Sequence, residues 1–269
     1  MFMVSYDRRH GESIENPPPL DRFTHLQCLR LHNIKLRPET IRAIHSLPML
    51  RELTLVYCLL DTEAELQLTG FLKSPRSLLK LDLILPKVTS DSASVPLLRS
   101  FKNLRSLKFI TTGRQPAYIL RALVTHNLAV SLTSIAVDVN TEEAVTLLLS
   151  VLHTSPNIKT IDLCKSNVNE ISVPVNIIPL LDTFKGPPHL ALPFVKGRRI
   201  HTVVFWERTN GLEGYLNVLE KSCTSIRTFV AIPRAPWTEA HTWLLIRYAP
   251  NLLKLEINSH FIEVGLISK

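Results

Sequence analysis

Short apolar motifs of the form L-x-x-L-x-L recur along the chain at a nearly constant interval. Leucine, isoleucine, valine or phenylalanine fills the apolar positions, with one alanine. The motifs are Leu26-Leu29-Leu31, Leu50-Leu53-Leu55, Leu78-Leu81-Leu83, Leu104-Leu107-Phe109, Leu132-Ile135-Val137, Ile158-Ile161-Leu163, the weak Leu181-Phe184, Ile200-Val203-Phe205, Ile226-Phe229-Ala231 and Leu252-Leu255-Ile257. Successive motifs begin 24, 28, 26, 28, 26, 23, 19, 26 and 26 residues apart. A repeat of this length predicts a solenoid in which each unit stacks on the next.

Each motif predicts a short strand, which is followed by a helical return. Within the L-x-L core, alternate residues point inward and the residue between them points to solvent. Residues 141–153 carry an apolar stripe at helical spacing, for which Asn140 and Glu143 are a candidate capping pair, and Thr238 is a candidate cap further on. A proline two or three residues before a motif stops the preceding helix, and Pro48, Pro75, Pro156 and Pro250 take such positions. We therefore expect an α/β solenoid with parallel strands on a concave face and helices outside.

Two segments depart from the repeat. Residues 1–19 are polar and end in three prolines, which predicts a flexible N-terminal tail ahead of a repeat domain over 20–269. Near 166–199 the motif intervals shorten to 23 and 19, and prolines are frequent. We expect the helix there to be lost or reduced to a turn. The stretch is either a kink in the solenoid or a loop that carries specificity.

The repeat resembles the leucine-rich repeat, in which asparagine or cysteine often stands three residues after the L-x-L core. Cys58 and Asn140 fill that position here. The long units resemble the ribonuclease-inhibitor-like class, which implies a horseshoe of about ten units. Residues 46–55 and 181–200 carry a further resemblance to the leucine-rich repeat region of F-box proteins from basidiomycete fungi.

That second resemblance implies recognition of a target protein for a ubiquitin ligase. The F-box proteins dock the ligase adaptor, and through it the cullin, with an N-terminal F-box that begins with an L-P-x-E-like sequence. Residues 1–25 contain nothing similar. Either this chain lacks an upstream segment that carries the F-box, or the repeats act without the ligase.

The charge of the chain is uneven. The net charge is +8, and residues 1–134 hold 18 basic and 11 acidic residues, a difference of +7. Solvated charged faces are common, so we expect a solubilising surface, while an acidic partner or nucleic acid stays an alternative.

The four cysteines are far apart and form no C-x-x-C pair, which argues against a disulfide framework or a zinc site. The N-terminus has no signal-peptide core, and no apolar run reaches the length that spans a bilayer. We expect a protein of the cytoplasm or nucleus that has no membrane partner.

No catalytic motif or phosphate-binding loop is present, and the chain has only 8 glycines. We predict no enzymatic activity and no cofactor. Candidate binding residues are those expected on the strand face, in the central position of the L-x-L core or just after it. They are Arg30, Tyr57, Asp82, Lys108, Asp162, Trp206, Glu207 and Glu256.

Charges of both signs along this row favour a protein partner over a polyanion. Trp206 and Tyr57 are candidate anchors, because aromatic side chains often carry much of the binding energy. The alternative is that Trp206 packs on its neighbouring strand. The leading hypothesis is a protein-interaction scaffold. A regulator of a GTPase that supplies Arg30 or Arg51, and association with nucleic acid through the basic half, are the alternatives.

Overall fold

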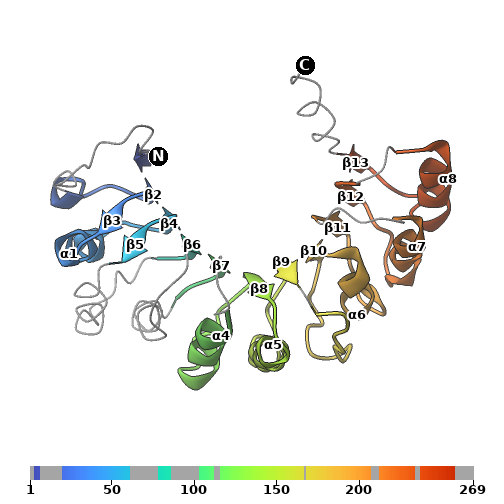
Figure 1. Ribbon diagram of the computed structural model, residues 1–269, viewed down its shortest axis with the longest axis horizontal. Coiled ribbons are helices and arrows are strands. Elements are labelled where there is room, and N and C mark those ends of the chain that lie inside the picture. Colours follow the sequence, from blue (N-terminus) through green and yellow to red (C-terminus); the bar gives the residue numbers. More distant parts are fainter. Residues whose placement is uncertain are drawn as a thin grey trace, which may run out of the picture. The chain divides into compact units, whose positions relative to one another are not determined.

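The computed structural model describes residues 3–6, 20–60, 78–85, 103–111, 116–166, 168–206, 212–233 and 237–257. The chain divides into two compact units, Met1–Asn157 and Ile158–Lys269. Each unit has a parallel sheet with helices on one of its faces, and among the described residues no helix covers the other face (Figure 1). We call the uncovered side the open face of that unit. The predicted α/β class and the parallel, solenoid-like arrangement are confirmed.

The sheet of the first unit runs in the order β1-β2-β4-β6-β7-β8, and the pair β3-β5 lies apart from it. The strands are β1 (Met3–Tyr6), β2 (Cys28–His32), β3 (Lys35–Leu36), β4 (Glu52–Val56), β5 (Leu59–Leu60), β6 (Lys80–Leu85), β7 (Ser106–Thr111) and β8 (Ser134–Val139). The helical segments are η1 (Leu20–Arg22), α1 (Pro38–Ser46), α4 (Pro116–Thr125) and α5 (Glu142–Thr154).

The strands of this sheet pair in the register that the motifs predict. The middle apolar residues align in one row, which is Leu29, Leu53, Leu81, Leu107 and Ile135. All five are buried. The carbonyl before each of β2, β4, β6 and β7 also accepts two N–H groups of the following repeat, as Gln27 accepts from Arg51 and Glu52. The repeat spacing in the sequence is therefore the spacing of equivalent positions in the structure.

The helices start and stop close to their predicted ends. Helix α5 covers the predicted stripe, but its cap is Thr141, whose Oγ1 accepts the N–H of Ala144 at 3.1 Å. The predicted cap at Asn140 is wrong by one residue because the helix begins one residue later than expected. Pro48 and Pro156 follow the ends of α1 and α5, as predicted.

His45 lies in the last turn of α1, where burial lowers the pKa of its imidazole below the ordinary 6.5. The unfolded chain then binds this proton at a higher pH than the folded chain does. The stability from neutral His45 is present above about pH 6.5 and is lost as the pH falls below it. We expect the unfolding free energy to fall less between about pH 7 and pH 5 in His45→Gln than in the wild type. Equal pH dependence in denaturant titrations of the two proteins would contradict this.

The second unit has its own parallel sheet in the order β9-β10-β11-β12-β13. The middle apolar residues align as Ile161, Phe184, Val203, Phe229 and Leu255. The strands are β9 (Thr160–Ser166), β10 (Thr183–Gly186), β11 (Thr202–Phe205), β12 (Thr228–Ala231) and β13 (Lys254–Ile257). The helical segments are η2 (Pro188–Leu190), α6 (Ala191–Val195), α7 (Glu213–Leu216), η3 (Asn217–Lys221) and α8 (Glu239–Tyr248).

Helix α8 begins as predicted at Thr238, whose backbone N–H donates to Nδ1 of His241 at 3.1 Å. The Nε2 of the same ring lies 2.8 Å from Glu213 Oε1 on α7. Because Nδ1 accepts a hydrogen bond, the ring proton is on Nε2, and this N–H donates a hydrogen bond to the Glu213 carboxylate. This buried histidine therefore both caps α8 and ties it to α7. Pro250 follows the end of the helix, as predicted.

The stretch where the motif intervals shorten contains little helix. The described residues between β9 and β10 form turns and no helix, and only the short η2 and α6 follow β10. The weak motif is nevertheless a strand. Gly186 occupies its third apolar position, and a Cβ there would lie 3.1 Å from Leu163 Cβ and 3.2 Å from Phe184 Cζ. Glycine thus fits where the neighbouring strand approaches most closely.

Cys58 is buried in the position where the repeat favours asparagine or cysteine. Its Sγ donates to the carbonyl of Leu31 in the preceding repeat at 3.3 Å. Burial raises the pKa of the thiol, and hydrogen bonds to backbone groups act in the opposite direction. The neutral thiol is therefore favoured, and it joins one repeat to the next.

Part of the expected N-terminal tail is a strand. β1 pairs in parallel with β2 over Met3–Tyr6, because the outer edge of β2 offers backbone groups to a further strand. The rest of the expected tail, residues 1–2 and 7–19, lies outside the described residues. No helix within the described ranges is both long enough and apolar enough to cross a membrane.

Candidate protein-interaction face

The predicted row of central L-x-L residues is present on the open face of the first unit. Arg30, Thr54, Asp82, Lys108 and Ala136 are direct neighbours across the strands. Arg30 is exposed, while Asp82 and Lys108 are half-buried. The structure thus brings three of the candidate residues together on one surface.

Opposite charges alternate across this surface. Lys80 Nζ lies 3.5 Å from Asp82 Oδ2 and 4.0 Å from Glu52 Oε2 on the strand before it. Cys28 Sγ lies 3.8 Å from Glu52 Oε2. Burial and this carboxylate raise the pKa of the Cys28 thiol. The face offers both acceptors and cationic donors, a mixture that matches a protein surface better than a polyanion.

An apolar row lies beside the charged one and was not anticipated from the sequence. Val56, Ile84 and Ile110 are neighbours in register, and all three are half-buried. Tyr57 follows directly and is exposed, with a backbone φ of 53° at the strand end and its N–H 2.6 Å from the Ile84 carbonyl. The first unit therefore carries apolar contact area next to its charges.

Tyr57 and Trp206, both candidates from just after the L-x-L core, do not occupy the same motif position. Trp206 follows the third apolar residue of its motif directly, as Val56 does, whereas Tyr57 comes one position later. The positive φ at Tyr57 ends its strand. Glu207, the third candidate from just after the core, lies outside the described residues.

The open face of the second unit has two rows in register. The first consists of Thr160, Thr183, Thr202, Thr228 and Lys254, and the central row consists of Asp162, Lys185, Val204, Val230 and Glu256. Lys185 was missed in the sequence because its motif is weak. Its place between Phe184 and Gly186 is the signal that could have found it.

The prediction that every central residue points to solvent is wrong at three positions. Ala136, Val204 and Val230 are buried. Charged residues in the same rows are more exposed, and the long side chains of Arg30, Lys108 and Lys185 can reach past their neighbours. The exposed surface of the central rows is therefore formed more by charged residues than the sequence alone predicted.

Trp206 is the centre of a cluster on the second unit. Its Nε1–H donates to Asp162 Oδ1 at 3.1 Å, two strands away, and Lys185 Nζ lies 6.0 Å from the ring centroid. Cys164 Sγ lies 3.5 Å from the same carboxylate oxygen. The side chain keeps 40% of its surface exposed. The indole thus packs over its neighbouring strands and still presents a rigid aromatic surface.

Glu256 lies at the end of the central row, where its carboxylate pairs with Lys254 of the same strand at 3.2 Å. Both residues point to the open face of the last strand.

Within the described ranges, no group of three or more histidine, cysteine, aspartate or glutamate side chains is arranged to hold a metal ion.

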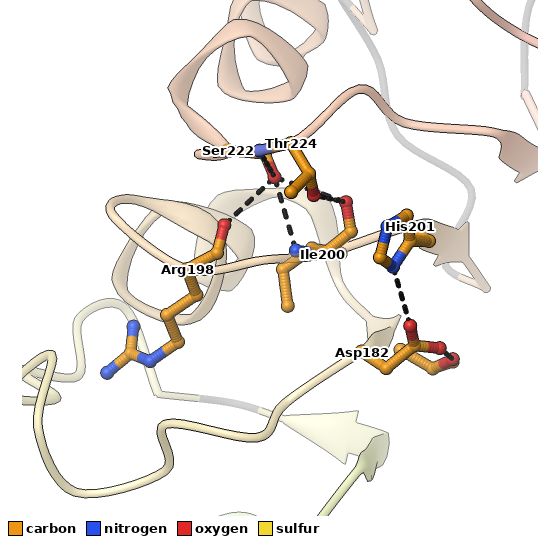
Figure 2. Close-up of polar contacts among 7 residues, drawn as sticks. Asp182, Arg198, Ile200, His201, Ser222 and Thr224 are labelled. Carbon is orange, nitrogen blue, oxygen red and sulfur yellow. Dashed lines mark hydrogen bonds and ion pairs between the residues drawn. The ribbon is translucent and has the colours of Figure 1, made fainter.

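A second polar group lies where the strands of this unit begin, and Figure 2 shows its members. His201 Nδ1 lies 2.7 Å from Asp182 Oδ1, and Thr183 Oγ1 donates to the other carboxylate oxygen at 3.1 Å. Ser222 Oγ lies 3.0 Å from the carbonyl of Arg198, and Thr224 Oγ1 donates to the carbonyl of Ile200 at 3.2 Å. The hydroxyls of Ser222 and Thr224 bind backbone carbonyls rather than the histidine, so these contacts hold loops in place.

Sequence reasoning missed the pair of Asp182 and His201. Both residues take the second position of their motifs, and the register makes them neighbours, since His201 N–H donates to the Asp182 carbonyl at 2.9 Å. Alignment of the motifs could have found them. The spacing of 19 residues hides the pair in the unaligned sequence.

Arg198 is buried, and its guanidinium holds the loop of the irregular stretch, which lacks a helix, by hydrogen bonds to backbone carbonyls. It donates to the carbonyls of Val173 at 3.2 Å, Pro174 at 2.7 Å and Pro193 at 2.5 Å. Burial lowers the pKa of the guanidinium from its ordinary value. Figure 2 shows the side chain pointing away from Ser222, toward the loop that lacks a helix. Arg198 therefore fixes that loop against α6.

No protein-family model matches this chain, and no curated protein matches it.

Proposed function

We propose that this chain is a non-enzymatic scaffold that binds a protein target through the open faces of its sheets. The cluster of Trp206, Asp162 and Lys185 is the observation that carries the proposal. A half-exposed tryptophan held by a hydrogen bond loses little freedom on binding, and such residues often dominate binding energy. Arg30, Asp82 and Lys108 supply charges that select a complementary protein surface.

The fold that we propose for this function is a leucine-rich repeat horseshoe of about ten units, with the strands on its concave face. Two features support it. The middle apolar residues are in register from strand to strand in each unit, and Cys58 bonds to the preceding repeat from the position that these repeats reserve for asparagine or cysteine. Such arrays commonly bind proteins on their long open surface.

The cellular context that we propose is target recruitment for a ubiquitin ligase, in the cytoplasm or nucleus. The resemblance of residues 46–55 and 181–200 to the repeats of fungal F-box proteins supports it. The adaptor and the cullin would join through an F-box supplied outside the repeats. The target itself would bind the open faces.

Affinity purification of the chain from its native host, read by mass spectrometry, tests both parts of the proposal. Stable partners that include the adaptor and the cullin are the expected result. Partners without any ligase subunit would remove the ubiquitin context and leave the scaffold. A chain recovered alone would contradict the scaffold as well.

A further inference from the structure

The last strand of the second unit, β13, has apolar residues exposed at positions that are buried elsewhere. Leu255 is 45% exposed, whereas the equivalent Phe229 and Val203 are fully buried. A middle motif residue is buried when neighbouring repeats lie on both of its sides. β13 pairs with β12 on one side, and among the described strands it has no neighbour on the other. Within the described residues, the apolar core of this unit is therefore partly exposed at β13.

Among the described strands, none pairs with the outer backbone edge of β13. In a parallel ladder, the residues that bond to one neighbour alternate with residues whose N–H and C=O point to the other side. Lys254 N–H donates to the Arg227 carbonyl at 2.9 Å, so Lys254 and Glu256 bond to β12. The backbone groups of Leu255 and Ile257 then point outward. An edge of this kind is a template for pairing with another strand.

The sequence of this edge is complementary to itself. Residues 253–257 read Leu-Lys-Leu-Glu-Ile. When two copies run antiparallel about a two-fold axis at Leu255, Lys254 of each copy lies opposite Glu256 of the other, and Leu253 lies opposite Ile257. Leu255 meets its own counterpart as a hydrogen-bonded pair, which matches the outward direction of its backbone groups.

We propose that β13 is a homodimer interface in which two copies of this chain pair antiparallel, edge to edge. Two-fold dimers use the same surface on both subunits, so a self-complementary edge is what such an interface requires. The pairing would cover Leu253 and Leu255. It would also place Lys254 of each copy opposite Glu256 of the other, which forms two ion pairs. It uses the edge of the sheet, whereas the proposed target site is centred on Trp206 of the open face.

Size-exclusion chromatography with light scattering, on the full chain over a range of concentrations, tests the dimer. The expected mass is twice the 30.5 kDa of one chain at high concentration, and it falls toward one chain on dilution. Lys254→Glu places two carboxylates opposite each other and is expected to weaken dimerisation at least tenfold. Glu256→Lys places two ammonium groups together and is expected to do the same.

The double variant Lys254→Glu, Glu256→Lys restores every opposite pair and is expected to recover the dimer. It also shows that both substitutions are compatible with the fold. Lys196→Glu, the same change of charge at an exposed position outside β13, is the matched control and should dimerise like the wild type. A wild-type chain that stays a monomer at every concentration would overturn the proposal and leave the edge to residues 258–269 or to a different protein. Single reversals that dimerise like the wild type would overturn it as well.

Discussion

Replacing Leu107 with alanine is expected to lower the unfolding free energy by about 2–5 kcal/mol. The side chain is fully buried at the middle of its motif, between Leu81 and Ile135 of the neighbouring strands. Truncation removes apolar contacts to both neighbours and leaves a cavity that the rigid sheet cannot close. Chemical denaturation followed by far-ultraviolet circular dichroism measures the loss.

Leu255→Ala is the matched control, because it is the same substitution at the same motif position in a strand with one described neighbour. Its side chain is half-exposed in the single chain, so at concentrations where the chain is a monomer we expect a loss of roughly 1 kcal/mol or less. All three tryptophans lie in residues 206–243, so their fluorescence reports on the second unit alone. A loss below about 0.5 kcal/mol for Leu107→Ala would show that the repeat register is wrong.

Replacing Trp206 with alanine is expected to weaken target binding by about 2 kcal/mol or more, which is about 30-fold in Kd. The indole is the large exposed aromatic of its cluster, and its hydrogen bond to Asp162 holds it in one orientation. The substitution removes contact area and the partner of Asp162. Titration of the purified target against wild type and variant measures the change.

Trp243→Ala supplies the control for that measurement. Trp243 lies on α8, on the helix-bearing side of the same unit, and is 63% exposed. We expect its loss to leave target affinity unchanged. Equal effects of the two substitutions would mean that the open face is not the binding surface of this unit.

The strand register was predictable because burial of the middle apolar residue depends on both neighbouring repeats. Ile161, Phe184 and Val203 differ in shape, but each must be buried between neighbouring repeats for the unit to be stable. An apolar residue is therefore needed at this position in every repeat, and its recurrence can be recognised in the sequence. Even the weak motif at Phe184 follows it, with Gly186 in place of a larger residue.

The chemistry of the face was less predictable because it depends on contacts between strands. Val204 and Val230 alternate as exposed residues should, but they are buried. Trp206 reaches an oxygen on Asp162, which lies 44 residues away in the sequence. The observed cap of α5 is Thr141 and not the predicted Asn140. Both residue types are good caps, and the position where the helix begins decides which of them acts as the cap.

The central claim is that the open faces bind the target, and one comparison of recovered partners tests it. The test protein carries alanine at Arg30, Asp82, Lys108 and Trp206. The matched control carries alanine at Arg42, Glu142, Lys196 and Trp243, which are exposed residues of the same chemical types on or next to helices. Both are purified from the native host alongside the wild type, after circular dichroism shows that they are folded. Loss of the target from the first variant and its retention by the second is the result that we predict. A folded first variant that keeps every partner of the wild type would contradict the claim.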